Sequence, residues 1–172
     1  MMKVLPKRFA KYGLTLHPEK TRLLEFGRSA QGKATRSGKK PDTFDFLGHT
    51  HVCARSRRGQ FTVHVRTMKK RFRRGLKAIA EWCQENRHMP VEKQQQTLNA
   101  KLRGHYQYYG RPTNFRSIWQ FFREVCHIWR TWLSRRTRGP GMTWVKYAAI
   151  LRKYPLLRPR ILHPWRRTES HA

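Results

Sequence analysis

Acidic residues are scarce in this sequence. Asp and Glu total 9 against 39 Lys and Arg in 172 residues, which leaves a net charge of +30. Even if every acid paired with a base, the surplus positive charge would repel itself in a compact chain. The imbalance argues against a neutral enzyme domain, an acidic activation segment and a binding module of balanced charge, and it predicts a polyanionic partner.

Long apolar runs and paired cysteines are also missing. The longest apolar run, Tyr147–Leu151, is far shorter than the roughly 20 residues that cross a bilayer, and residues 1–16 lack the apolar core of a secretory signal. Positive charge is spread along the chain rather than along one amphipathic helix, so we expect no membrane partner. Cys53, Cys83 and Cys126 are odd in number and dispersed, which suits a reducing cytoplasm.

The few acids are not grouped for metal catalysis. Polymerases and nucleases hold Mg²⁺ with clustered carboxylates, but the closest plausible pair here is Asp42 and Asp45. At a spacing of three on an extended chain, their side chains point to opposite faces. We therefore expect no catalytic residues, no metal site and no cofactor bound by these residues.

One zinc alternative stays open. His49, His51 and Cys53 share a strand face, and His64 falls on the next predicted strand. Zinc accepts such nitrogen and sulfur ligands, although its usual ligand spacings are absent. A polar strand face is the favoured interpretation.

Apolar residues are abundant enough for a folded core, since 38% of the chain is hydrophobic and 12% aromatic. The patterns predict an α+β fold with a mixed, β-rich region over 1–65, a helical bundle over 66–154 and a basic extended tail over 155–172. In the first region we expect the end of a helix at Lys7–Tyr12 and a strand at Thr21–Phe26. A mobile loop is expected at Ser29–Pro41, followed by a hairpin whose two strands are Phe44–Cys53 and Gln60–Val65.

From residue 66 the apolar residues follow a helical period. Three long helices and a shorter one are predicted over about 66–85, 91–109, 115–136 and 143–154. Their apolar rows are Met68, Phe72, Leu76, Ile79 and Cys83; Val91, Gln95, Leu98, Leu102 and Tyr106 or Tyr109; and Ile118, Phe121, Phe122, Val125, Ile128 or Trp129, and Trp132 or Leu133. Gly104, inside the second helix, suggests a close helix contact.

Basic residues are concentrated on these predicted helices. Six of them fall within residues 66–74, namely Arg66, Lys69, Lys70, Arg71, Arg73 and Arg74. Arg116, Arg123 and Arg130 recur every seven residues and so stack along one ridge, and Arg135 and Arg136 follow. A solvated helix face would normally mix signs, so this arrangement favours phosphate contacts beside exposed aromatic rings. RNA and DNA both remain open at this point.

Several segments resemble bacterial group II intron reverse transcriptase/maturases. Residues 13–21 (GLTLHPEKT) and 44–50 (FDFLGHT) are similar to the end of the palm, and residues 98–110 (LNAKLRGHYQYYG) to the maturase-specific, or X, domain that forms the thumb. Residues 129–138 and 154–161 are similar to the C-termini of members that lack an endonuclease domain. The blocks occur in the family's order over nearly the whole chain.

The resemblance implies roles for particular residues. Lys20 matches a lysine near the incoming triphosphate, and Phe46, Leu47 and Gly48 match the hairpin that lies against the primer end, where Gly48 would allow close backbone approach. The thumb helices, which include Arg103, would hold intron RNA and the RNA–DNA template–primer duplex. The fold expected is a partial palm followed by a helical thumb.

The family's catalytic Tyr-Ala-Asp-Asp strand does not occur in these residues. By resemblance it would precede Met1, so we expect a truncated member of the RNA-directed DNA polymerases that has no polymerase activity alone. Mg²⁺ is expected only in an intact polymerase, and an N-terminal reverse transcriptase fragment in trans is a further implied partner.

The expected function is therefore intron RNA binding and maturase-type support of splicing, within a bacterial cytoplasmic ribonucleoprotein. Two alternatives stay open, which are a free-standing basic RNA chaperone and an unrelated DNA-binding module.

Overall fold

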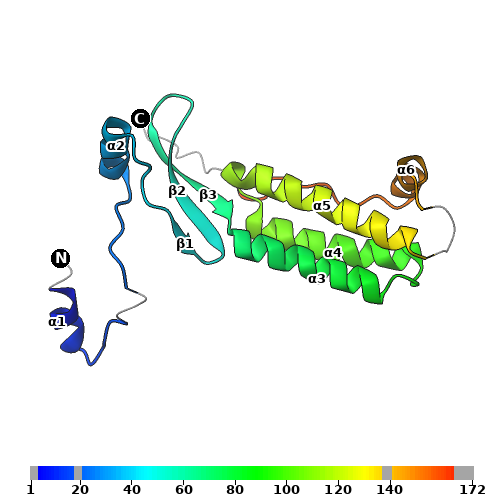
Figure 1. The fold of residues 1–172 in the computed structure, drawn as a ribbon, viewed down its shortest axis with the longest axis horizontal. Helices are drawn as coiled ribbons and strands as arrows, with labels where there is room; N and C mark the ends of the chain where they lie inside the picture. Colours follow the sequence, from blue (N-terminus) through cyan, green and yellow to red (C-terminus); the bar gives the residue numbers. More distant parts are fainter. Residues whose placement is uncertain (1–3, 18–20, 137–140, 165–172) are drawn as a thin grey trace, which may run out of the picture. The chain divides into compact units, whose positions relative to one another are not determined.

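The computed structural model describes residues 4–17, 21–136 and 141–164, and within them the fold is α+β, as predicted (Figure 1). A three-stranded antiparallel sheet is followed by several helices. The elements are α1 (Leu5–Ala10), α2 (Arg28–Ser37), β1 (Phe44–Phe46), β2 (His49–Arg55), β3 (Phe61–Thr67), α3 (Lys69–Glu85), α4 (Val91–Tyr109), a 3₁₀ turn (Pro112–Asn114), α5 (Phe115–Ser134) and α6 (Trp144–Lys153).

The chain divides into two compact units. One comprises residues 1–44 and 52–63, and the other comprises residues 45–51 and 64–172. The boundary expected at residue 65 falls inside β3, and β2 and β3 each contribute residues to both units. No helix in the described ranges is long and apolar enough to cross a membrane.

Two expectations for the first unit are wrong. Most of the predicted loop Ser29–Pro41 belongs to the helix α2, which begins one residue earlier, at Arg28, and ends at Ser37. Its Ala, Arg, Lys and Gln residues are good helix formers despite the low hydrophobicity of the segment. Gly38 ends α2 in the left-handed conformation. The predicted strand Thr21–Phe26 has no regular secondary structure. The Glu25 amide donates a hydrogen bond to the Asp42 carboxylate at 2.9 Å, so this amide is bonded to a side chain and not to a neighbouring strand.

The predicted hairpin between the second and third strands is confirmed, but the segment Phe44–Cys53 is two strands rather than one. Leu47 and Gly48 both have positive φ, 46° and 75°. Such a pair forms the two-residue turns that fold a strand back onto its neighbour. The sheet therefore has the order β1–β2–β3. The sequence does not indicate this turn, because its first position is a leucine, whereas a positive φ is usually adopted by Asn, Asp or Gly.

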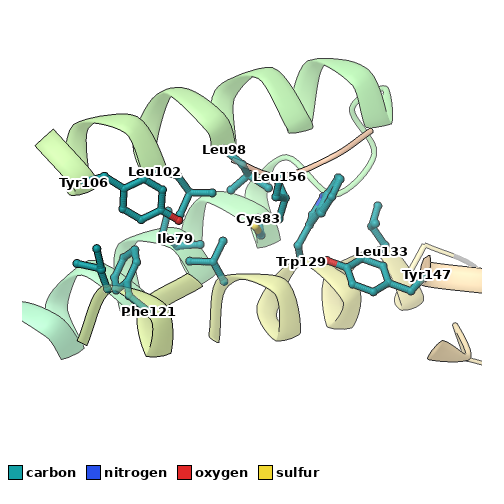
Figure 2. Packing of buried hydrophobic residues seen from close by; sticks show 12 residues of the cluster. Ile79, Cys83, Leu98, Leu102, Tyr106, Phe121, Trp129, Leu133, Tyr147 and Leu156 are labelled. Atoms are coloured by element: carbon teal, nitrogen blue, oxygen red, sulfur yellow. The ribbon is translucent and has the colours of Figure 1, made fainter. Parts of the chain in front are cut away.

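The helical unit has its core between α3, α4 and α5 (Figure 2). On α3, Ile79 and Cys83 of the predicted row are buried and Phe72 and Leu76 pack against the core, whereas Met68 precedes the helix. On α5 the predicted Ile118, Phe121 and Val125 are buried, and of the alternatives left open by the spacing the structure buries Trp129 and Leu133. On α4 the buried row contains Gln94 in place of the expected Gln95.

The close helix contact expected at Gly104 is wrong. A Cβ atom at Gly104 would have nothing within 4 Å, whereas one at Gly75 would lie 3.1 Å from the ring of Phe121. The close approach is therefore between α3 and α5.

The described part of the C-terminal tail, residues 155–164, has no regular secondary structure and packs on α4. Leu156 is buried, and Asn99 binds both sides of it, donating to the Pro155 carbonyl at 3.1 Å and accepting from the Leu157 amide at 2.7 Å. Tyr106 donates to the Leu157 carbonyl at 2.9 Å. These contacts make this segment part of the helical unit.

Candidate nucleic-acid interface

Very few of the positive charges are neutralised by the chain's own acids. In the described ranges the ion pairs are Lys33–Glu25 at 3.1 Å and Lys77–Glu81 at 3.6 Å, and all four side chains are mostly exposed. Exposed pairs of this kind contribute little to stability. Most of the exposed cations in the described ranges therefore have no acidic partner within the protein.

The first turns of α3 carry the densest group of cations. The apolar residues Phe72 and Leu76 face the core, which leaves Lys69, Lys70, Arg71, Arg73 and Arg74 exposed; Arg66 is also exposed near the end of β3. A pocket of about 370 Å³ opens here, lined by Arg66, Lys69, Arg73, Phe72, Thr67, Ser117 and Gln120. Three cations around a partly polar hollow can contact a phosphate.

The α5 side of this pocket continues the positive surface. Arg116 and Arg123 are exposed, one residue before Ser117 and one turn after Gln120. Beside them the rings of Phe115 and Trp119 are about 40% exposed and nearly parallel, with centroids 6.3 Å apart. Exposed aromatic faces beside arginines are the surface on which unpaired bases stack. We call Arg66, Lys69, Lys70, Arg73, Arg74, Arg116 and Arg123 the basic face.

The arginines at and after the C-terminal end of α5 differ from the basic face because their side chains contact other groups of the protein. Arg130 donates to the Met142 carbonyl at 2.8 Å, and its guanidinium lies 4.2 Å from the centre of the Trp144 ring. Arg136 donates to the Arg87 and Met89 carbonyls, and burial lowers its pKa. Arg135 is exposed but lies over Trp132, at 4.7 Å. Of the three arginines predicted to form one ridge, Arg116 and Arg123 are therefore exposed, whereas Arg130 is bonded within the protein.

The turn Leu47–Gly48 is held by the helical unit. The Tyr108 hydroxyl donates to the Leu47 carbonyl at 2.5 Å, and the Met68 amide donates to the Gly48 carbonyl at 3.0 Å. The side chains of Phe46 and Leu47 are 60% and 68% exposed. The turn is thus fixed by its backbone while it presents two apolar side chains outward.

A second pocket, of about 420 Å³, lies beside this turn. His49 and Tyr108 form one wall, with ring centroids 5.3 Å apart and ring planes 24° apart. Phe46, Leu47, His51, Val65, Gln107, Arg111 and His163 complete the lining. Burial lowers the pKa of His49. No local sequence pattern predicts this pocket, because Tyr108 and Leu47 are 61 residues apart.

Three predicted site residues, Lys20, Arg71 and Arg103, are not part of the basic face. Lys20 lies outside the described residues. Arg103 is exposed on α4. The side chain of Arg71 lies 3.8 Å from a Cβ position at Gly48, beside the turn, and does not line the pocket of about 370 Å³.

The metal alternatives gain no support. The part of the chain that the structure describes contains no group of three or more His, Cys, Asp or Glu side chains arranged to hold a metal ion. The Asp45 carboxylate accepts a hydrogen bond from Thr50 at 2.5 Å, and the sulfur of the buried Cys53 accepts one from the Gly27 amide at 3.4 Å.

Comparison of the chain with protein-family models, with curated proteins and with solved structures finds no match. The candidate site therefore rests on its own geometry, which is a positive face with adjoining aromatic rings and two pockets.

Proposed function

We propose that this chain binds structured RNA through the basic face and supports group II intron splicing, as the C-terminal part of an intron-encoded reverse transcriptase/maturase. The observation that carries the proposal is the group of exposed cations on α3 and α5. No acid is paired with any of these seven side chains among the described residues.

Physical chemistry supports a polynucleotide partner. Binding of phosphates to Lys and Arg releases condensed counterions, which supplies a favourable and salt-dependent free energy. The exposed Phe115 and Trp119 rings add a stacking surface, which suits unpaired bases in RNA loops and bulges. The sequence resemblance to maturases points to intron RNA as the physiological ligand.

The direct test is fluorescence anisotropy with a labelled group II intron domain and with duplex DNA of equal length, at 50 to 200 mM salt. We expect tighter binding to the RNA and a loss of about 10³-fold or more over this range if six or more phosphates are contacted. Equal affinity for both ligands favours the DNA-binding alternative. Absence of binding to the RNA at the lowest salt contradicts the proposal.

Splicing support is tested separately from binding. Intron self-splicing at low Mg²⁺ is measured with the chain, without protein, and with a double variant, Arg116→Gln with Arg123→Gln. We expect acceleration by the wild-type chain and a reduced effect of the variant. An unchanged rate on addition of the wild-type chain contradicts the maturase role while leaving RNA binding in place.

DNA synthesis is not proposed for the chain by itself. Its sequence lacks the paired aspartates that hold Mg²⁺ in polymerases, so primer extension by the purified chain is expected to stay at background. Mg²⁺-dependent nucleotide incorporation that copurifies with the chain contradicts this expectation.

A further inference from the structure

The pocket beside the Leu47–Gly48 turn has walls of two kinds. The His49–Tyr108 stack, with Phe46, Leu47 and Val65, forms a flat and mainly apolar part. Arg111, Gln107 and His163 supply polar groups at other points of the lining. Its volume of about 420 Å³ lies within the range of small-molecule sites.

The polar groups favour an anion near the apolar wall. Arg111 is exposed, and the described residues include no carboxylate in the lining of this pocket. The imidazole of His163 is held by the Gln107 carbonyl at 2.6 Å, which fixes its ring at the pocket. A ligand with a flat apolar part and a negative charge matches both sets of groups.

His49 adds a hydrogen-bonding feature. Its Nδ1 lies 3.1 Å from the Leu47 carbonyl, which can only accept, so Nδ1 carries the proton. In the neutral ring Nε2 is then an acceptor. This atom is buried and has no hydrogen-bond partner among the described residues, in a side chain only 6% exposed. Such a buried acceptor is costly unless a donor reaches it, and an amino or hydroxyl group of a ligand could supply one.

We propose that this pocket binds a single unpaired nucleotide, with the base against Tyr108 and the phosphate toward Arg111. Purines and pyrimidines have flat π-faces and exocyclic amino groups, and the ribose carries hydroxyl donors, so one nucleotide satisfies the apolar wall, the cation and the His49 acceptor together. The proposal rests on the proposed RNA binding for its physiological source and adds a defined subsite to it.

Stacking of a base on Tyr108 requires an unpaired nucleotide. A base inside a duplex exposes only its edges, whereas the Tyr108 wall requires access to a face, as in unstacked bases of single-stranded RNA. The ligand is therefore a free nucleotide, a strand end or a base turned out of a loop.

The first experiment measures the pocket directly with the full chain. Adenosine 5′-monophosphate, adenosine and ribose 5-phosphate are titrated against the protein by NMR, with the signals of His49 and Tyr108 followed. We expect the monophosphate to bind more tightly than either part. Equal binding of ribose 5-phosphate and the monophosphate indicates a simple anion site and overturns the proposal.

Variants then test separately the space beside the apolar wall and the positive charge of Arg111. Gln107→Trp places a large ring at the pocket from an exposed position and is expected to abolish binding of the monophosphate. Arg111→Gln is expected to weaken the monophosphate roughly tenfold and to leave adenosine unchanged. Arg152→Gln, on an exposed position of α6, removes the same charge and serves as the matched control. Retained binding in Gln107→Trp, with a folded protein by circular dichroism, overturns the proposal.

The source of the nucleotide is resolved with two labelled RNA hairpins, one blunt and one with a single unpaired 3′ nucleotide. We expect the overhang to tighten binding by the wild-type chain at least threefold, about the lower limit of one base–aromatic stack, and to have no effect in Gln107→Trp. Tight binding of both hairpins with no overhang effect, together with no binding of the monophosphate, overturns the pocket and leaves the proposed function standing. No binding of either hairpin overturns the proposed function.

Discussion

The indole Nε1 of Trp129 donates a hydrogen bond to Oε1 of Gln94 at 2.8 Å, between two side chains that are at most 1% exposed. The amide nitrogen of Gln94 donates in turn to the carbonyls that follow α3, those of Asn86, Arg87 and Met89. One polar side chain therefore connects α4, α5 and the α3–α4 loop within an apolar core.

Loss of this side chain should destabilise the helical unit strongly. Gln94→Ala leaves the indole N–H of Trp129 without a protein partner. It also removes one donor from three carbonyls, although those of Arg87 and Met89 keep Arg136 and that of Asn86 keeps the Met89 amide. Because a buried unpaired group costs about 1–3 kcal/mol, we expect the free energy of unfolding to fall by about 2–3 kcal/mol in urea titrations. Gln96→Ala, two residues away on an exposed position, is the matched control and should change it by less than about 0.5 kcal/mol. Equal effects of the two substitutions would contradict the role assigned to Gln94.

The two glycines of α3 and α4 should respond in opposite directions to alanine. Gly104 has open space around a Cβ position, so Gly104→Ala should stabilise the protein by about 0.5–1 kcal/mol through helix propensity. At Gly75 the added Cβ meets the Phe121 ring at 3.1 Å.

That ring cannot easily move, because it stacks on His105 with centroids 3.7 Å apart and packs edge-on against Phe72. Gly75→Ala should therefore destabilise the protein despite the better propensity. Thermal melting of both variants checks the sign, and stabilisation by Gly75→Ala would contradict the packing argument.

The sequence predicted the helical unit well because its helices are long and strongly amphipathic. On α5 the spacing alone predicted the buried Ile118, Phe121 and Val125. It did not choose between Ile128 and Trp129 or between Trp132 and Leu133, of which Trp129 and Leu133 are buried. Gln94 was not predictable from spacing, since a glutamine in an apolar row normally lies at the edge of the row. Its burial depends on an indole 35 residues away, and no local pattern reports such a partner.

The errors lie where local composition and tertiary contacts disagree. Helix α2 contains few apolar residues, and only Ala30 is buried, so hydrophobic periodicity could not reveal it. The turn at Leu47–Gly48 depends on a positive φ at leucine, with the Tyr108 hydroxyl holding the carbonyl. Seven-residue spacing correctly placed Arg116 and Arg123, but it could not show that Arg130 lies against Trp144.

Stability should depend on pH through His105. Burial lowers the pKa of His105 to about 4, and its Nε2 has no hydrogen-bond partner among the described residues. In the unfolded chain a histidine titrates near 6.5. Between pH 6.5 and 4 the unfolded state therefore binds more protons, so the free energy of unfolding falls as the pH falls.

We expect a contribution of roughly 2 kcal/mol from this residue between pH 7 and 4.5. His105→Phe keeps a ring against Phe121 but cannot be protonated, so its unfolding free energy should decline less over this range. Urea titrations at several pH values measure the difference. Parallel pH profiles of the wild type and His105→Phe would contradict the assignment.

Holding of the turn by Tyr108 can be tested with a minimal change. Tyr108→Phe removes the hydroxyl that donates to the Leu47 carbonyl and retains the ring beside His49. Because the side chain is 49% exposed, the global effect should be at most about 1 kcal/mol. Amide exchange at residues 47–50 should become faster than in the wild type, and Tyr12→Phe, at an 81% exposed position, should leave these rates unchanged. Unchanged exchange in Tyr108→Phe would show that the turn is held by its other contacts.

The arginines of α5 should separate into binding and structural groups. Arg123 is exposed without an ion-pair partner among the described residues, so Arg123→Gln should reduce the salt dependence of RNA binding by about one unit of log Kd per log salt and leave stability unchanged.

Arg130→Gln loses the hydrogen bond to the Met142 carbonyl and the contact with the Trp144 ring. It should lower the free energy of unfolding by about 1–2 kcal/mol and change the salt dependence less than Arg123→Gln does. The same anisotropy and urea measurements on both variants decide the assignment. A larger change of salt dependence in Arg130→Gln would mean that this guanidinium leaves Trp144 to reach a phosphate, and that the ridge predicted by seven-residue spacing acts as one surface in the complex.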